Sequence, residues 1–280
     1  MRTIPFDELA TAVENLVVET NYVLPDDILG SLRRAREVET VPLAASILDR
    51  IIENALIAAR ERLPLCQDTG VAVFFLDAGD GISVDGRGIV EAVQEGTRRG
   101  YKNGGLRMSM VEDPVRRENT GDNTPAVIHC RPVPGERLRV SFCPKGAGCE
   151  NVSRVAMLPP GAGADGIGDF VVETVRQGNG KPCPPLIAGV GIGGDFEYAA
   201  LIAKRALLRP VGDRHPDTLY ADMERAIVER LNGLGIGPLG LGGGTTVLDV
   251  FIETHPCHIA SLPVAVNIQC HSARHGTIEL

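Results

Sequence analysis

The sequence CPPLIAGVGIGGDFEYAALIAKRALL (residues 183–208) contains a predicted strand and a predicted helix in direct succession. Leu186 to Val190 is a continuous apolar run of strand length, and Phe196 to Leu208 has apolar residues at helical spacing. Glycines at 189–194 join the two. A strand that leads directly into a helix is typical of an α/β protein.

Outward from this stretch, helices and strands are mixed without a regular βαβ repeat. Apolar residues at helical spacing predict helices at 6–17, after Pro25, at 44–55 with Thr40 as its cap, and at 89–101, 167–177 and 215–231. Strands are predicted at 71–76, 126–133, 137–143, 247–252 and 263–268, with Pro134-Gly135 as a hairpin turn. We therefore expect a mixed α/β fold: a helical N-terminal region followed by mixed sheets surrounded by helices.

Composition excludes several classes of protein. The 280 residues are 44% hydrophobic and 23% charged, so the chain can bury a core. The net charge of −8 argues against nucleic-acid binding and against anionic membrane surfaces. No apolar run approaches the roughly 18 residues of a membrane span, and the start, MRTIPFDELATAVENL, has helical spacing where a signal peptide would have an apolar block.

Cysteine and glycine are unusually distributed. Seven cysteines, none in a CxxC pair, fit a reducing compartment, so we expect a cytoplasmic protein. Twenty of the 33 glycines fall between Gly146 and Gly244, which indicates close approaches or turns of the backbone. A binding site in this half explains that concentration better than a linker does.

Three cysteines lie at the edges of predicted strands, beside polar or turn-forming residues: Cys66, Cys183 and Cys270. Any one of them could be an inert buried thiol, which is how we interpret Cys130, Cys143, Cys149 and Cys257. Together, three thiolates can hold three irons of a [4Fe–4S] cluster and leave the fourth iron open to substrate. Spacing alone does not decide between these interpretations.

The glycine motif suggests a different activity. Gly189, Gly191 and Gly194 form GxGxxG between a predicted strand and a predicted helix, as in NAD-dependent dehydrogenases. The acidic partner would be Asp213, which falls in a predicted loop. The alternative is a tight turn whose helix N-terminus offers N–H groups to an anion. A second cluster, residues 240–244, lacks the lysine of a phosphate-binding loop.

Three further positions could contact an anionic substrate. Lys145 in PKGAGCEN and Arg107 in GGLRMS are cations beside glycine turns, and either could bind a carboxylate or simply be solvated. His258, in PCHI, could be an acid, a base or a hydrogen-bond donor, or a hydrogen-bonded core histidine.

Taken in order, six motifs resemble the alpha chain, or N-terminal domain, of the class I iron–sulfur hydro-lyases, the fumarate hydratases and L(+)-tartrate dehydratases. They are LPLCQDTG, NTPAVIH, PKGAGCEN, CPPLIAGVGIGG, GIGPLGLGGGTT and PCHIASLPVAVNIQCHSAR. The resemblance runs from about Thr40 to Arg274. One departure is Cys149, where the family has serine.

The resemblance implies a [4Fe–4S] cluster on Cys66, Cys183 and Cys270. It implies substrate contacts from Gln67, Asp68, Arg107, Lys145, Gly148 and His258, with Asp68 and His258 as catalytic candidates. Residues 1–280 would be a single domain, with a helical part at 1–62 and a cluster- and substrate-binding part at 63–280. Asp68, beside a proposed ligand, would orient or act as the base.

Single-chain members of this family continue into a second domain that is not present here. The resemblance therefore implies an alpha subunit that needs a beta subunit of about 200 residues, in an α2β2 assembly. The expected reaction is reversible hydration of fumarate to L-malate. Alternatives are dehydration of L(+)-tartrate to oxaloacetate and, more distantly, an NAD-dependent dehydrogenase that uses residues 189–194. The substrate is a small dicarboxylate in each hydro-lyase case.

Overall fold

The apolar pattern at the start of the chain forms three helices in the computed structural model, which describes residues 2–280. They are α1 (Phe6–Tyr22), α2 (Asp26–Val38) and α3 (Pro42–Glu61), so the helices predicted in this region are confirmed. The predicted Thr40 cap is wrong. Helix α3 begins at Pro42, and the carboxylate of Glu39 accepts the Val41 N–H at 2.9 Å.

The chain divides into two compact units, each assembled from separated segments. Unit 1 comprises the chain up to Pro25, Ala55–Ala147 and Arg274–Leu280, and unit 2 comprises Asp26–Asn54 and Gly148–Ala273. Each unit thus takes residues from both sides of position 62. That residues 1–280 act as a single domain stays a prediction.

Unit 1 is built on a mixed sheet with the strand order β10-β5-β2-β4. Its strands are β2 (Val71–Gly79), β4 (Val127–Val133), β5 (Leu138–Lys145) and β10 (Gly276–Glu279). The predicted hairpin at Pro134-Gly135 is wrong, because β2 lies between β4 and β5 and pairs with both. The connection instead passes the end of β2, where Gly81 N–H donates to the Gly135 carbonyl at 2.9 Å. Two short strands, β1 (Arg2–Ile4) and β3 (Ile82–Val84), pair separately.

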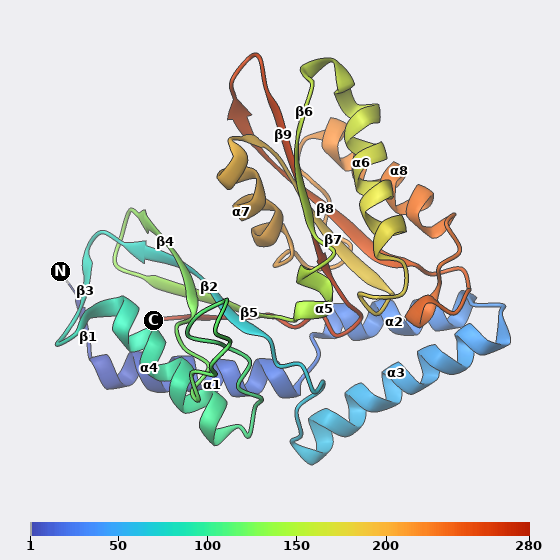
Figure 1. Ribbon diagram of the computed structural model, residues 1–280. Helices are drawn as coiled ribbons and strands as arrows, with labels where there is room; N and C mark the ends of the chain where they lie inside the picture. Colours follow the sequence, from blue (N-terminus) through green and yellow to red (C-terminus); the bar gives the residue numbers. More distant parts are fainter. Residues whose placement is uncertain (1) are drawn as a thin grey trace. The chain divides into compact units, whose positions relative to one another are not determined.

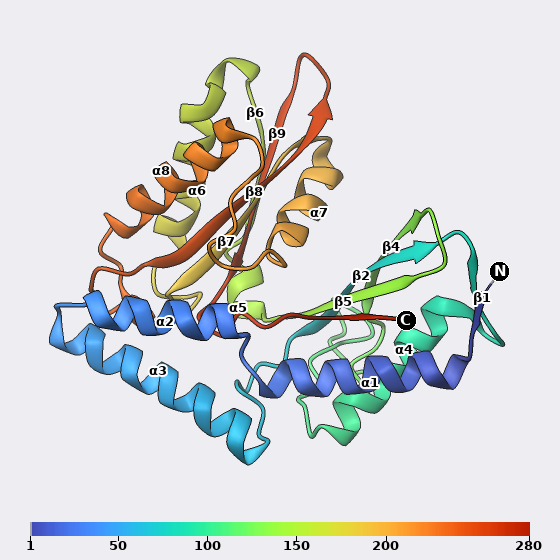
Figure 2. The same cartoon turned by 180° about the vertical axis from the view of Figure 1, so that it is seen from behind.

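Helices α1 and α4 (Gly88–Asn103) cover one face of this sheet (Figures 1 and 2). Phe74 of β2 and Phe142 of β5 are fully buried beneath them, with ring centroids 4.9 Å apart. The two helices approach closely because Gly96 has no side chain. A Cβ at that position would lie 2.5 Å from the Ala10 carbonyl oxygen.

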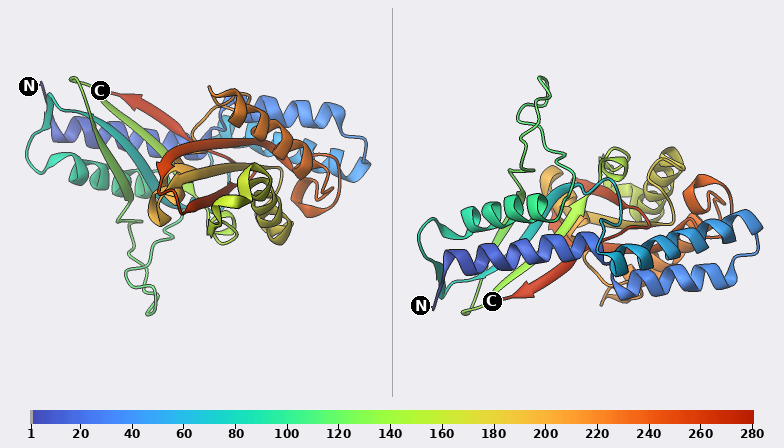
Figure 3. Two further views of the ribbon diagram at one scale, coloured as in Figure 1. Left: turned by 90° about the horizontal axis from the view of Figure 1, so that it is seen from above. Right: turned by 90° about the horizontal axis from the view of Figure 1, so that it is seen from below.

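A long segment, residues 104–126, connects α4 to β4. In both views of Figure 3 it extends away from the helices and sheet of unit 1. An ion pair of 2.9 Å between Arg98 of α4 and Asp122 fixes one end of the segment. The segment matters because it carries Arg107.

Unit 2 is built on a second mixed sheet with the order β6-β9-β7-β8. Its strands are β6 (Arg154–Leu158), β7 (Leu186–Gly194), β8 (Val247–Cys257) and β9 (Leu262–Gln269). Helices α6 (Gly163–Gly178) and α8 (Thr218–Asn232) pack on one face, and α7 (Phe196–Ala206) packs on the other (Figure 1). The sequence did not predict β6, a short edge strand.

The glycines of the GxGxxG motif lie inside β7 rather than in a turn after it. They allow α7 to pack directly on the strand: a Cβ at Gly189 would lie 2.1 Å from the Ala203 carbonyl oxygen, and one at Gly191 would lie 2.0 Å from that of Ala199. The side chain of Asp195 caps α7 by accepting the N–H groups of Glu197 and Tyr198. The motif therefore serves helix-on-strand packing.

A buried carboxylate links the helices of unit 2 to its sheet. Glu224 of α8 is fully buried and accepts hydrogen bonds of 2.9 Å from the Arg209 guanidinium and from the Ile252 N–H of β8. Because both its oxygens are paired, this buried charge is compensated within the unit.

The prediction of a mixed α/β fold is confirmed, since helices cover mixed sheets in both units. No helix within residues 2–280 combines the length and the apolar character needed to cross a membrane.

Candidate active site

Cys66 lies in the loop that joins α3 to β2 in unit 1. Its side chain is half-buried, and its Sγ accepts the Asp68 N–H at 3.4 Å. The preceding residue is also fixed, because Leu65 N–H donates to the Asn21 carbonyl of α1 at 2.9 Å. An N–H donor of this kind stabilises a sulfur that carries negative charge.

Asp68 joins the Cys66 loop to the glycine turn after β5. Its Oδ1 accepts the Gly70 N–H at 3.0 Å, and its Oδ2 accepts the Ala147 N–H at 2.9 Å. Gly146 allows this approach, since a Cβ there would lie 3.1 Å from Asp68 Oδ2. The structure therefore brings together two motifs that are 79 residues apart.

Lys145 ends strand β5 beside this carboxylate. Lys145 is only 3% exposed and pairs with Val71, the first residue of β2. Gly70 makes room for it, because a Cβ at Gly70 would lie 2.7 Å from the Lys145 backbone. Gly148, by contrast, is exposed and lies in the short helix α5 (Ala147–Glu150).

Arg107 is held near this loop by its backbone. Its carbonyl accepts a hydrogen bond of 3.0 Å from the Thr69 hydroxyl. The guanidinium is exposed and has no ion-pair partner within residues 2–280. A cation placed in this way can bind a carboxylate from solution.

Two buried residues that the sequence did not single out organise the Thr69–Gly70 backbone. Tyr101 donates its hydroxyl to the carbonyls of Thr69 (2.7 Å) and Gly70 (3.1 Å), and burial raises its pKa. Asn123 Nδ2 donates to the Gly70 carbonyl at 3.2 Å. Its Oδ1 accepts the Ser109 N–H at 2.6 Å, which fixes the segment that follows Arg107. Neither role has a local sequence signal.

Cys183 and Cys270 lie close together in unit 2. The residue after Cys270, His271, donates its N–H to the Cys183 carbonyl at 3.3 Å, and its Nδ1 lies 2.9 Å from the same oxygen. Antiparallel pairing of β7 with β9 explains this, because Ile187 lies opposite Gln269. Cys183 is exposed and Cys270 is half-buried.

The corner that carries Cys183 is supported from two sides. The Cys149 Sγ donates to the Pro182 carbonyl at 3.5 Å, and Leu239 N–H donates to the Pro184 carbonyl at 2.8 Å. Gly240 packs on this corner, where a Cβ would lie 2.5 Å from the Gly180 Cα. Gly240, the first residue of the second glycine cluster, therefore has a packing role.

His258 lies in the exposed turn between β8 and β9, where its Nδ1 accepts the Ala260 N–H at 3.1 Å. Cys270 follows the other end of β9. The eight residues of β9 separate its ends by about 23 Å. Unit 2 therefore does not bring His258 to Cys183 or Cys270.

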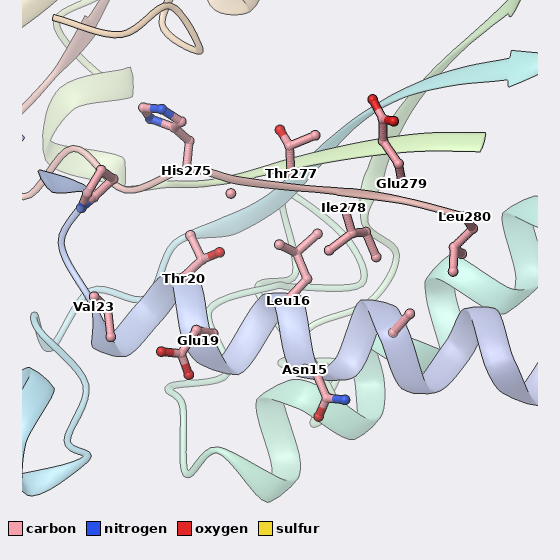
Figure 4. Close-up of a pocket in the computed structure, with 13 residues that line it drawn as sticks. Asn15, Leu16, Glu19, Thr20, Val23, His275, Thr277, Ile278, Glu279 and Leu280 are labelled. Atoms are coloured by element: carbon pink, nitrogen blue, oxygen red, sulfur yellow. The ribbon is translucent and has the colours of Figure 1, made fainter. Parts of the chain in front are cut away.

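A groove in unit 1 lies elsewhere, between α1 and β10, and has a volume of about 640 Å³. Figure 4 shows Leu16 of α1 facing Ile278 across it. None of the predicted site residues lines this groove, so we do not assign the active site to it.

The cysteine chemistry fits an iron–sulfur cluster. All seven cysteines are thiols, and the three predicted ligands are half-buried or exposed in loops that the protein itself supports. Cys66 belongs to unit 1, and Cys183 and Cys270 belong to unit 2. Within residues 2–280, no group of three or more His, Cys, Asp or Glu side chains forms a ready-made metal site.

Comparison with known proteins decides the family. The model of the family described as fumarate hydratase (Fumerase) matches residues 10–279. The chain belongs to this fumarate hydratase family. All nine predicted site residues fall inside the match.

Named relatives of this family member span nearly the same length. This chain is 42% identical over 273 residues to a Methanocaldococcus jannaschii protein provisionally named L(+)-tartrate dehydratase subunit alpha, and the match covers 95% of each chain. It is 33% identical over 278 residues to the L(+)-tartrate dehydratase subunit alpha of Escherichia coli K12, covering 97% of this chain and 90% of that protein. The Shigella boydii protein of the same name matches equally.

Proposed function

We propose that this chain is the alpha subunit of a [4Fe–4S]-dependent L(+)-tartrate dehydratase. The observation that carries the proposal is its identity, along almost the whole length, to relatives named as that subunit. In the reaction, tartrate loses a hydroxyl from one carbon and a proton from the neighbouring carbon. The products are water and an enol that tautomerises to oxaloacetate.

Hydration of fumarate to L-malate is the second candidate. The family description favours it, and the bond changes are the same, since water is added across or removed from two adjacent carbons of a dicarboxylate. We place tartrate first because the relatives that match along the chain carry that name. The dehydrogenase alternative loses its basis, because the glycines at 189–194 are occupied in packing α7 on β7.

We assign Cys66, Cys183 and Cys270 as the residues that would hold the cluster. When bound, a cluster with three protein ligands supplies one iron with an open position that acts as a Lewis acid. The exposure of Cys183 and the partial exposure of Cys66 and Cys270 support this assignment. The other four cysteines are not needed for it.

The chain's own side chains would bind and orient the dicarboxylate. Arg107 supplies an unpaired guanidinium for one carboxylate, and Gln67, which is exposed beside Cys66, supplies an amide. Asp68 would orient the base or would itself be the base that accepts the departing proton. Each of its oxygens keeps a lone pair beyond the one used by a backbone N–H. Lys145 and Gly148 are assigned as further substrate contacts. His258, predicted as a substrate contact and second catalytic candidate, lies beyond the end of β9 opposite to Cys270, so its role stays a prediction.

We also propose that a beta subunit of about 200 residues completes the enzyme as an α2β2 assembly, since the relatives are named as alpha subunits. Seven cysteines present as thiols fit a reducing compartment, the cytoplasm.

The test is an anaerobic preparation of the chain with its beta subunit, reconstituted with iron and sulfide. We expect oxaloacetate from L(+)-tartrate with a kcat/KM at least about tenfold above that for L-malate dehydration. A higher value for L-malate or fumarate would favour the second candidate, and a colourless, inactive complex would contradict both.

Matched cysteine variants test the ligand assignment. Cys183→Ser should lower bound iron and abolish activity, whereas Cys130→Ser, an exposed thiol outside the ligand set, should leave both unchanged. Iron content and the visible spectrum measure the first effect, and turnover measures the second. Equal losses in the two variants would contradict the assignment.

A further inference from the structure

Arg274 is a buried cation beside the Cys66 loop. Its residue is only 4% exposed, and it lies in unit 1 just after the segment that carries Cys270. Within residues 2–280 it forms no ion pair with a carboxylate, and its Nε has no hydrogen-bond partner. A buried charge of this kind is unfavourable unless its hydrogen bonds compensate for the lost hydration.

Those contacts tie the two ends of one short loop together. The Nη2 of Arg274 donates to the Asp68 carbonyl at 2.9 Å, and its Nη1 donates to Asn21 Oδ1 at 3.3 Å. Asn21 is itself fully buried, and its backbone carbonyl accepts the Leu65 N–H at 2.9 Å. One guanidinium thus links the residue before Cys66 to the residue after Gln67.

We propose that Arg274 is a positioning residue that sets the conformation of Leu65–Asp68, and so the placement of the Cys66 sulfur and the Gln67 amide. Its relevance to catalysis rests on the proposed function. Arginine suits this task because its planar group offers several N–H donors in a fixed fork, and two of them here reach acceptors on different segments. A lysine ammonium on a flexible stem would reach one of them at a time.

The test uses the full chain without its cluster and compares the wild type with Arg274→Gln. Amide hydrogen exchange, read on a peptide that covers 64–70, should be about tenfold faster in the variant. The rate at which iodoacetamide alkylates Cys66 should change several-fold. Cys183 and Cys270, which belong to unit 2, should keep their rates and serve as internal controls.

Three further variants separate positioning from general loss of stability. Arg274→Lys should recover part of the protection, because it retains one donor. Asn21→Ala should loosen the same peptide to a smaller extent, and it decides the question if Arg274→Gln does not fold. Arg209→Gln, which removes a half-buried arginine from unit 2, should lower stability without a selective change at Cys66.

Unchanged exchange at 64–70 in Arg274→Gln, or equal changes at all three cysteines, would overturn the proposal. These measurements need neither substrate nor cluster. Failure of the tartrate assay would therefore leave them interpretable, and their failure would leave the proposed reaction untouched.

Discussion

At the scale of single residues, the loop around Cys66 is defined by hydrogen bonds from distant positions. Tyr101 and Asn123 hold the Gly70 carbonyl, and Arg274 holds that of Asp68. Such contacts leave no pattern in the sequence, since Asn21 and Arg274 are 253 positions apart. The motif LPLCQDTG singles out Cys66 and Asp68 as candidates, whereas no motif marks the side chains that position them.

Asp68→Asn tests the carboxylate. Asparagine retains one acceptor oxygen but presents an NH₂ group to the second backbone N–H, so it loses one hydrogen bond and cannot take up a proton as a base. We expect kcat to fall about 10²-fold or more in a cluster-replete complex. Iron content should be measured in parallel, and unchanged turnover at full iron occupancy would contradict the role.

Arg107→Ala tests the carboxylate-binding cation. A hydrogen bond to a charged group contributes about 1.5–3 kcal/mol, so KM should rise about 10- to 100-fold with a smaller change in kcat. Arg116→Ala is the matched control, because Arg116 is an exposed arginine on the same segment. Equal effects of the two variants on KM would remove Arg107 from the site.

At the scale of elements, the sequence predicted most helices and strands but mispaired two of them. Pro134-Gly135 has the local features of a hairpin turn, yet β2 takes the place between β4 and β5 because it can pair with both. Residues 186–206 do form a strand followed by a helix, as predicted. The glycines, however, lie inside the strand, where they let the helix pack closely, and they do not form a nucleotide-binding loop. Local patterns identify elements, whereas pairing depends on which distant strand competes.

Gly191→Ala tests this assignment of the glycine motif. The added Cβ would lie 2.0 Å from the Ala199 carbonyl oxygen, so α7 must shift, and we expect a loss of about 1–3 kcal/mol in unfolding free energy. Gly161→Ala is the control, because its Cβ would meet nothing within 4 Å. Denaturant titration measures both, and similar stability in the two variants would refute the packing role.

The ion pairs at the base of the 104–126 segment predict a pH dependence. A hydrogen bond from Arg99 lowers the pKa of Glu95 below 4.5, against burial, with further help from Arg98. The pKa of Asp122 is also lowered; burial opposes this, and hydrogen bonds from Thr124 and Arg98 prevail. A carboxylate whose pKa is lower in the folded state stabilises that state above its unfolded pKa and loses this effect as the pH falls.

The free energy of unfolding should therefore decrease as the pH falls from about 5 to 3, and Glu95→Gln should weaken that decrease. Unfolding titrations at several pH values measure the slope. Arg99→Gln should reproduce the weaker slope, since it removes the partner rather than the carboxylate. An unchanged slope in both variants would contradict the assignment.

At the scale of the whole molecule, the proposed function requires a chain of net charge −8 to admit a dianionic substrate. Local cations would then have to outweigh the global charge, and we propose this role for Arg107, which has no ion-pair partner within residues 2–280. The predicted ligands of the cluster are divided between the two units, but each ligand loop is fixed by hydrogen bonds within its own unit.

Because hydrogen bonds within each unit fix these loops without a metal, we expect iron removal to leave the fold intact. An iron chelator or air should bleach the protein and abolish activity together, while far-ultraviolet circular dichroism stays close to that of the loaded enzyme. Anaerobic addition of iron and sulfide should restore both colour and turnover. Unfolding on chelation would show instead that the metal, rather than the supporting hydrogen bonds, holds these loops in place.

Strand β10 and Arg274 belong to unit 1 but follow all of unit 2 in the sequence. Ser141 of β5 and Thr277 of β10, which share a hydrogen bond, are therefore 136 positions apart. The ribosome synthesises the Cys66 loop early, but it adds Arg274, which donates a hydrogen bond to this loop, only after all of unit 2. Until then the nascent chain exposes the edge of β5 and leaves the Cys66 loop without the Arg274 hydrogen bonds, which is the kind of partly folded state on which chaperones act. The order of synthesis thus delays the maturation of this loop until nearly the whole chain has emerged.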